Sequence, residues 1–395
     1  MEQPNPNPGC RGAEAVLNLG SSSSIPISYH PLFGSYDDIM LPELDEKLLP
    51  DIPNQRVVVR GQPDEDAVLC TQSKTYAIKF VGNSNSIFLI PPLDQSDFPN
   101  TIVDPNEKDP NPQAVASVIK VAPGNMELVE VAPRLDKLKF LLLENPYRSE
   151  EDTEIDLEMT GRGLYKWDHL VDRVQASDDE LRSGLQALSA VEINGYWRVL
   201  DEKYMDMMLR MLLHNSVLND WSLEELDQDK VVDVLKSDGF PRKLAEHCLY
   251  VYGQKLSEGT GTSCMWKLDD KRVCVQFARE ILRGGRKKMD NFMDEWKRKI
   301  PEGMEASLEM LEGEVLTEKL GVDSWVRPYS VSSLPSEPAK RFSMLFKERA
   351  KWEWKDLHPY IKDLTVPGLS SEGLLLKYTR RTQPMPTSEP VFCAR

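Results

Sequence analysis

The hydrophobic positions near the middle of the chain follow a helical period. Leu181, Leu185 and Leu188 recur at helical spacing and define one apolar stripe. Ser177 lies four residues before Leu181, and Glu180 lies three residues after Ser177. This spacing is the pattern of a capping box. The pattern therefore predicts an amphipathic helix that begins directly after Ser177.

A strand period follows this helix. Val191 and Ile193 alternate with polar residues up to an Asn-Gly pair ending at Gly195, and Trp197 and Val199 alternate after it. Asn-Gly tolerates the positive φ of a type I′ turn, so the segment predicts a hairpin with Trp197 on its core face. Upstream, another helical stripe consists of Leu164, Trp167, Leu170, Val171 and Val174. The order of helix, capped helix and hairpin is typical of a winged helix, which is a binding fold, although an unrelated α+β fold could also contain it.

Short runs of branched and aromatic residues dominate the first part of the chain. They cover residues 57–59, 67–71, 75–80, 86–90, 115–121 and 126–131. Turn-forming residues separate them at 61–64, 82–83 and 123–125, and a long Pro- and Asn-rich loop is predicted for 91–113. Strands at this spacing predict a small β-barrel or sandwich, which we expect to be incomplete and to need a partner.

Helical texture takes over in the second half. Residues 134–144 predict a helix that ends at Asn145-Pro146 and acts as a hinge, before an acidic connector at 149–160. Three later segments each open with a tryptophan, namely Trp167, Trp221 and Trp354. This recurrence predicts tandem helical units.

The predicted fold class is therefore α+β, with an N-terminal β-barrel-like domain followed by about three tandem winged helices. The predicted boundaries are 1–30 for a disordered tail, 31–133 for the β-barrel-like partner-assembly domain, 134–162 for the helix and acidic linker, 163–203, 204–284 and 285–381 for three winged helices, and 382–395 for a second disordered tail.

Composition narrows the class of protein. The 395 residues carry a formal net charge of −16, and their six cysteines show no C-x-x-C pair. No apolar run approaches the roughly 20 residues that span a bilayer, and the N-terminus lacks the order of a secretory signal. We therefore expect an intracellular protein with reduced thiols and no membrane partner.

Motifs for chemistry are absent from the sequence. The chain has no phosphate-binding G-x-x-x-x-G-K-[ST] loop, no H-E-x-x-H and no G-x-S-x-G. Acidic residues cluster as in Asp178-Asp179-Glu180, where a solvated helix start explains them. We therefore expect no enzymatic activity, no cofactor and no metal.

Two basic clusters stand out against the acidic background. Residues 267–299 contain 11 Lys and Arg against 6 Asp and Glu, a local balance of +5, and a second cluster lies between residues 340 and 381. Such side chains neutralise phosphates and give sequence-tolerant, salt-sensitive binding, although a basic face that pairs with the acidic remainder is the alternative. The predicted DNA-binding residues are Arg286, Lys287, Lys288, Lys377, Arg380 and Arg381. The acidic start of the capped helix predicts instead that the first unit packs against protein.

Several longer runs resemble one known family. They are DEDAVLCTQSKTYAIKF (64–80), LLLENPY (141–147), INGYWRVLD (193–201), EHCLYVYG (246–253), IPEGMEASLEMLEG (300–313) and RFSMLFKERAKWEWKDLHPYIKDL (341–364). These runs look like the DCC family, the "defective in sister chromatid cohesion" subunit of the alternative replication factor C clamp loader. The resemblance departs in the Asn-Pro-rich head, in residues 91–113 and in residues 313–338.

The resemblance implies a non-enzymatic nuclear subunit of a clamp loader devoted to sister chromatid cohesion. In this family the N-terminal β region assembles with the large and small chromosome transmission fidelity subunits into a joint barrel that contacts DNA polymerase epsilon. The C-terminal winged helices bind DNA, and the loader acts on the sliding clamp PCNA. The alternative reading is a free-standing winged-helix transcription regulator or scaffold, but the chain lacks a helix rich in the Arg, Asn and Gln that pair with base edges.

Overall fold

The computed structural model describes residues 26–31, 33–34, 39–44, 46, 48–49, 52, 56–90, 116–149, 163–256, 264–383 and 389–395. These residues form 11 α-helices and several sheets, so the predicted mixture of helices and strands is confirmed. None of the helices in these residues is long and apolar enough to cross a membrane. The chain divides into two compact units, Met1–Arg56 with Tyr76–Val129, and Val57–Thr75 with Glu130–Arg395.

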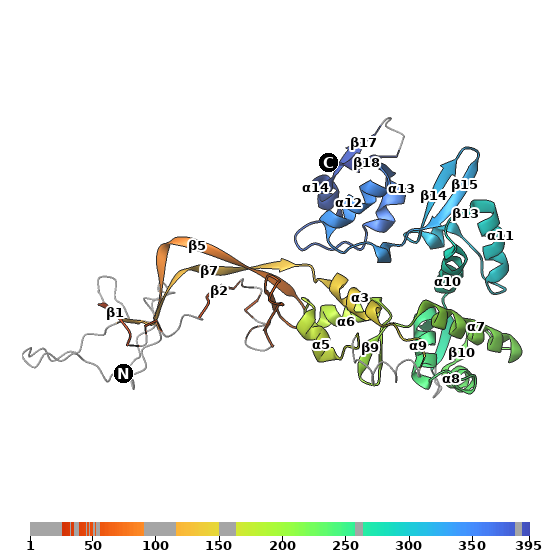
Figure 1. The fold of residues 1–395 in the computed structure, drawn as a ribbon, viewed down its shortest axis with the longest axis horizontal. Coiled ribbons are helices and arrows are strands. Elements are labelled where there is room, and N and C mark those ends of the chain that lie inside the picture. Colours follow the sequence, from red (N-terminus) through yellow and green to blue (C-terminus); the bar gives the residue numbers. More distant parts are fainter. Residues whose placement is uncertain are drawn as a thin grey trace, which may run out of the picture. The chain divides into compact units, whose positions relative to one another are not determined.

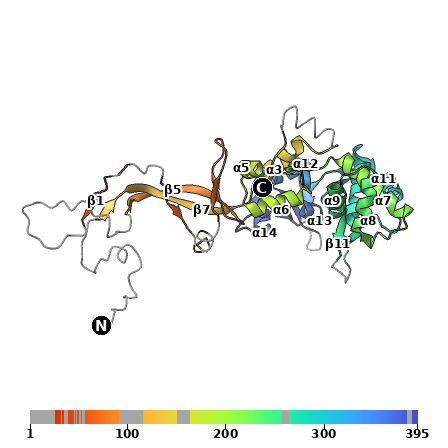
Figure 2. The same cartoon turned by 90° about the horizontal axis from the view of Figure 1, so that it is seen from below.

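The first unit is built around two long strands. Its strands are β1 (Ile27–Tyr29), β2 (Pro42–Glu43), β6 (Ala116–Val118), β7 (Lys120–Val131) and most of β5 (Thr75–Leu89). β1 pairs in parallel with β6, and β2 pairs in parallel with β7 at Met126 and Glu127. Figures 1 and 2 both show β5 and β7 running side by side, as they do in the sheet order β2-β7-β5-β4-β3.

The long strands correct two predicted turns. Residues 82–83 lie inside β5 and residues 123–125 lie inside β7. A Cβ atom at Gly124 would collide with the Val81 carbonyl, and it would lie 3.0 Å from the Cα of Gly82. These glycines therefore permit a close approach of two backbones, which is the other common role of glycine in strands. The sheet is open, and no sheet in the described residues closes into a barrel, so the predicted barrel does not form within that part of the chain.

The second unit opens with the hairpin of β3 (Val58–Arg60) and β4 (Val68–Cys70). The predicted turn between them is confirmed, because the Glu65 N–H donates to the Gln62 carbonyl at 2.9 Å. Arg60 is buried and donates to the Asp178 carboxylate and to the Ala176 carbonyl. The hairpin is thereby fixed to the start of α6 (Asp178–Ala187).

The same order of elements, namely helix, strand, two helices and hairpin, occurs in four successive passes along the rest of the second unit. The first pass comprises α3 (Leu135–Glu144), a bridge from Tyr165 to Trp197, α5 (Trp167–Arg173), α6, β8 (Val191–Ile193) and β9 (Tyr196–Arg198). The second comprises α7 (Glu202–Leu218), β10 (Leu226–Asp227), α8 (Gln228–Ser237), α9 (Arg242–Tyr252), β11 (Gly253–Lys255) and β12 (Met265–Leu268).

The third pass comprises α10 (Asp270–Leu282), β13 (Lys287–Lys288), α11 (Met289–Lys299), the 3-10 helix η1 (Leu308–Leu311), β14 (Val315–Leu320) and β15 (Asp323–Pro328). After η2 (Val331–Ser333), the fourth comprises α12 (Pro338–Glu348), β16 (Lys351–Glu353), α13 (Trp354–Leu357) with η3 (His358–Tyr360), α14 (Ser371–Tyr378), β17 (Thr379–Thr382) and β18 (Val391–Ala394). In the last three sheets the final strand lies between the other two, in the orders β10-β12-β11, β13-β15-β14 and β16-β18-β17. We call these passes the first to fourth repeats.

The local predictions for the first repeat are confirmed. The Ser177 side chain accepts from the Glu180 N–H at 3.3 Å, and the Glu180 carboxylate accepts from the Ser177 N–H at 2.9 Å. Asn194 and Gly195 have φ values of 52° and 84°, as a type I′ turn requires. Trp197 is half-buried and packs against the cluster that contains Leu181 and Leu185.

The helix at 134–144 is confirmed, while its role as a hinge stays a prediction. α3 contributes Leu138, Leu141 and Leu142 to the hydrophobic cluster of the first repeat. It approaches α6 so closely that a Cβ atom at Gly184 would lie 2.9 Å from a methyl group of Leu135. α3 therefore belongs to the first repeat, because its apolar stripe is buried against α6.

The repeats also differ from the predicted division of the second half. The described residues contain four repeats where about three units are predicted, since α10 begins a repeat inside the predicted segment 204–284. β18 lies in the predicted disordered tail 382–395 and pairs with both β16 and β17, which corrects that prediction. One core spans the second and third repeats and includes Val191 of the first, and a separate core centred on Trp352 and Tyr360 lies in the fourth and includes Leu316 of the third. The finer domain boundaries stay predictions.

Candidate nucleic-acid interface

The structure gathers the first predicted cluster around a tryptophan of the third repeat. The Arg286 guanidinium lies 5.3 Å from the centre of the Trp325 ring, and the Lys288 ammonium lies 5.9 Å from it. Lys288 also pairs with Asp323 at 2.8 Å, and Lys287 pairs with Glu295 at 2.6 Å. The hydrogen bond from Lys287 lowers the pKa of Glu295 from its ordinary value. Lys287 and Lys288 therefore pair with acidic residues, as the alternative of a basic face that pairs with the acidic remainder predicts for these two side chains.

The second predicted cluster lies along one helix and strand of the fourth repeat. Lys377 stands in the last turn of α14, and Arg380 and Arg381 follow on β17. All three are exposed. Among the described residues none of them has a carboxylate partner, since Lys377 lies over the Tyr378 ring at 5.2 Å and Arg381 donates to the Gln383 amide at 3.2 Å. Their charges are therefore available to a ligand.

The sequence of the fourth repeat explains this placement. Ser370 caps α14 by accepting from the Gly373 N–H, and Leu374 and Leu375 turn into the core. β17 then pairs with β18 over its whole length. Arg380 and Arg381 are consecutive residues of β17, so their side chains leave opposite faces of the strand, and both are exposed. The two basic clusters lie on different sheets, β13-β15-β14 and β16-β18-β17.

The acidic start of α6 contacts protein, as predicted. Asp178 accepts from Arg60, Asp179 accepts from Gln72 at 2.8 Å, and Glu180 accepts from Thr75 at 2.6 Å. Arg60 lies on β3, Gln72 lies between β4 and β5, and Thr75 is the first residue of β5. The first repeat therefore uses this helix end to hold its own chain rather than a phosphate backbone.

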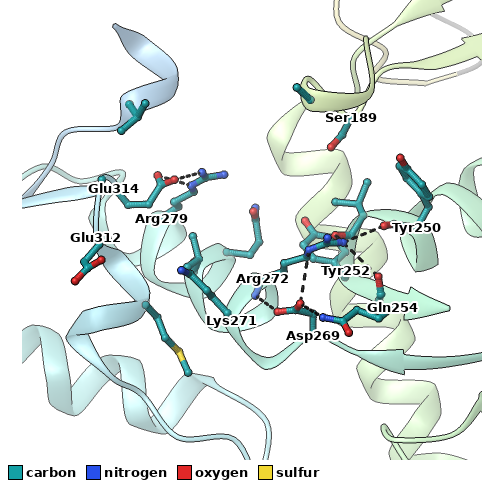
Figure 3. A pocket seen from close by; sticks show the side chains of 18 of the residues that line it. Ser189, Tyr250, Tyr252, Gln254, Asp269, Lys271, Arg272, Arg279, Glu312 and Glu314 are labelled. Atoms are coloured by element: carbon teal, nitrogen blue, oxygen red, sulfur yellow. Dashed lines mark hydrogen bonds and ion pairs between the residues drawn. The ribbon is translucent and has the colours of Figure 1, made fainter. Parts of the chain in front are cut away.

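A cleft of about 980 Å³ lies where the four repeats meet, and sequence reasoning missed it (Figure 3). On one wall, Arg272 donates to the carbonyls of Tyr250 and Val251 at 3.3 and 3.1 Å and pairs with Asp269 at 3.8 Å. On another wall, Arg279 forms a bidentate ion pair with the Glu314 carboxylate, at 2.6 and 3.0 Å. These contacts use guanidinium donors within the protein: Arg272 joins the third repeat to the second, and Arg279 pairs within the third repeat. The sequence gives no local signal for it because its lining comes from four separate segments.

Comparison with known proteins gives the family. A family model described as "Sister chromatid cohesion protein Dcc1" matches residues 39–361, which is more than half of the chain. The chain belongs to the Dcc1 family of sister chromatid cohesion proteins. This finding confirms the resemblance drawn from the sequence and supports a role in sister chromatid cohesion.

Curated members of the Dcc1 family match nearly the whole chain. The "Sister chromatid cohesion protein DCC1" of Danio rerio is 33% identical over 384 residues, covering 94% of this chain and 94% of that protein. The Homo sapiens protein of the same name is 32% identical over 349 residues, covering 87% and 85%. The Saccharomyces cerevisiae protein of that name is 21% identical over 385 residues, covering 88% and 93%. The range matched by the family model includes residues of both units.

Proposed function

We propose that this chain is a non-catalytic nuclear subunit of the alternative replication factor C-like clamp loader. In this proposal it supports the loading or unloading of PCNA at replication forks, and thereby cohesion. It would assemble with the large and small chromosome transmission fidelity subunits and contact DNA polymerase epsilon. Membership of the Dcc1 family across both units carries the proposal.

We further propose that the four repeats are winged helices. A winged helix places its third helix and its terminal hairpin on one side of a three-helix core, where they can meet DNA. The repeated order of helix, strand, two helices and hairpin supports this assignment, as does the central position of the last strand in three sheets. Exposed basic residues in the third and fourth repeats supply charge that can neutralise phosphates.

The open sheet of the first unit supports assembly with partner subunits. Among the described residues, β2 pairs with only Met126 and Glu127 of the 12 residues of β7. The exposed fractions of Phe80 and Phe88 on β5 are 57% and 46%. Unpaired strand edges and exposed aromatic side chains are features that a partner strand would cover.

Co-expression with the two chromosome transmission fidelity subunits tests the assembly. We expect the full chain to co-purify with them at a fixed stoichiometry in moderate salt. The double variant Phe80→Ser/Phe88→Ser should lose this association, while the unmodified chain keeps it. Failure of the unmodified chain to associate would overturn the proposed assembly.

DNA binding is tested by reversing charge in the fourth repeat. The variant Lys377→Glu/Arg380→Glu/Arg381→Glu should bind unrelated duplexes more weakly by similar factors, because these residues would meet phosphates rather than bases. The slope of log Kd against log salt should fall in magnitude by up to about 3, close to one for each phosphate that is no longer neutralised. Fluorescence anisotropy over a series of salt concentrations measures both quantities.

The matched control carries the same change of charge in the second repeat, at the exposed residues Lys230, Lys236 and Lys243. It should keep more of the affinity than the fourth-repeat variant. Equal losses in the two variants would mean that net charge alone drives binding. A steep preference of the unmodified chain for one duplex sequence would favour a transcription regulator instead.

A further inference from the structure

The hairpin of the third repeat ends in an apolar tip. Leu320 pairs with Asp323 across a two-residue turn formed by Gly321 and Val322. Gly321 has a φ of 67°, a conformation that favours glycine. Val322 is fully exposed, at 103%, and Leu320 is 50% exposed. Two branched aliphatic side chains therefore stand in solvent at the end of a tight turn.

The base of the same hairpin is held firmly. Val326 and Leu316 are buried, and the Tyr360 hydroxyl donates to the Val315 carbonyl at 2.8 Å. Arg349 donates to the Thr317 carbonyl. The tip thus projects from an anchored base beside α11, as Figure 1 shows.

Basic side chains lie on the face that carries Leu320. Glu318, Trp325 and Lys288 occupy one row across the sheet, and Leu320 shares their face because side chains alternate along a strand. Arg286 covers the Trp325 ring on this face. Glu318 is paired with Arg327 at 2.7 Å, and Asp323 is paired with Lys288, so the acidic groups near the tip are already neutralised. Arg286 adds positive charge on this face that complements a phosphate backbone, while the exposed Lys319 lies on the opposite face of β14 and adds positive charge beside the tip.

We propose that this tip is a wedge that inserts at the junction between single-stranded and double-stranded DNA. The inference rests on the DNA binding proposed above and adds the kind of DNA that is recognised. Apolar side chains that enter DNA separate stacked bases, which costs a few kcal/mol per step inside a duplex. Burying one or two aliphatic side chains returns a free energy of about the same size. The wedge therefore favours a junction, where one face of the last base pair is already open.

The test uses the full chain and the variant Leu320→Ser/Val322→Ser. Anisotropy measures binding to a forked duplex and to a blunt duplex of equal length and sequence, and 2-aminopurine at the last paired position reports unstacking. We expect the unmodified chain to prefer the fork and to raise the 2-aminopurine fluorescence. The variant should lose roughly fivefold or more in affinity for the fork, as removal of a buried aliphatic side chain implies, and should keep its affinity for the blunt duplex.

The control is Val217→Ser, which changes an 80% exposed valine on α7 and should alter neither signal. The proposed wedge is overturned if the tip variant and the unmodified chain have equal affinities for each duplex and raise the 2-aminopurine fluorescence equally. The proposed DNA binding is unaffected by that result. If the unmodified chain binds neither duplex, the proposed DNA binding and the wedge both fall.

Discussion

Gly195 shows how one residue can fix the hairpin of the first repeat. Its φ of 84° follows that of Asn194 at 52°, and together they give the turn a twist that matches the flanking strands. A Cβ atom at Gly195 would meet nothing within 4 Å. Any cost of a side chain at this position is therefore a cost in backbone conformation alone.

We predict that Gly195→Ala destabilises the second unit by about 1 to 2 kcal/mol, the penalty of a left-handed conformation for an L-residue. Urea denaturation followed by circular dichroism measures the change. Gly284→Ala is the matched control, because Gly284 also has open space around its Cβ position but lacks a positive φ. Equal effects of the two substitutions would contradict the assignment of strain to the turn.

Residue-scale signals predict the structure well where the deciding neighbours are close in sequence. The capping box at Ser177 and the Asn194-Gly195 turn depend on contacts within three residues, so the sequence predicts them correctly. Gly82 and Gly124 show the opposite case. They resemble turn residues locally, but contact between β5 and β7 holds them in extended strands.

At the scale of elements, His247 joins the second repeat to the first. It lies on α9, is only 8% exposed, and its Nε2 lies 2.9 Å from the carbonyl oxygen of Ser189 in the first repeat. Burial lowers the pKa of His247 below its ordinary value, although the hydrogen bond to Ser189 acts in the opposite direction. The folded protein therefore holds a neutral imidazole that donates from Nε2.

We predict that this contact makes stability fall as the pH drops below about 6.5, the ordinary pKa of histidine. Below that value the unfolded chain binds a proton that the folded chain resists, so protonation favours unfolding. Urea midpoints between pH 7.5 and 5.5 should fall more steeply for the unmodified chain than for His247→Gln. An identical pH dependence in the two proteins would count against the buried neutral state.

The recurring tryptophans predict the number of repeats only in part. Trp167 and Trp354 begin the second helices of the first and fourth repeats, and Trp221 precedes the first strand of the second. In the third repeat, the second helix, α11, begins at Met289 rather than at a tryptophan, and the short 3-10 helix η1 occupies the position of the third helix. A search for the tryptophan pattern therefore merges the third and fourth repeats.

At the scale of the whole molecule, the two units bury very different amounts of apolar surface. The second unit contains three hydrophobic clusters, with Trp296 and Trp352 almost fully buried. In the described part of the first unit, the buried apolar residues are Leu48, Tyr76, Ala116, Val118 and Ala122. Because local stability follows buried apolar contacts, the first unit should open more readily.

We predict faster hydrogen exchange for backbone amides of residues 80–88 and 126–129 than for those of α9. Adding the two chromosome transmission fidelity subunits should slow exchange in β5 and β7, since partner strands and side chains would cover them. Mass spectrometry of deuterium uptake measures both effects. Uniform protection in the free chain would contradict the expected difference between the units.

Several individual elements and the family can be recognised from the amino-acid sequence alone. Helix starts, the turn at Gly195, the end of α3 at Asn145 and the two basic clusters all follow from residues that are neighbours in the chain. The longer runs indicate the family because they occur in order between residues 64 and 364, and the family model matches residues 39–361.

The way these elements combine becomes visible in the folded chain. There α3 joins the first repeat and β18 completes the last sheet, while Lys287 and Lys288 pair with carboxylates and Lys377 has none among the described residues. Burial, strand pairing and ion pairing all depend on residues that are distant in sequence. For that reason no local pattern of polar and apolar positions specifies those partners.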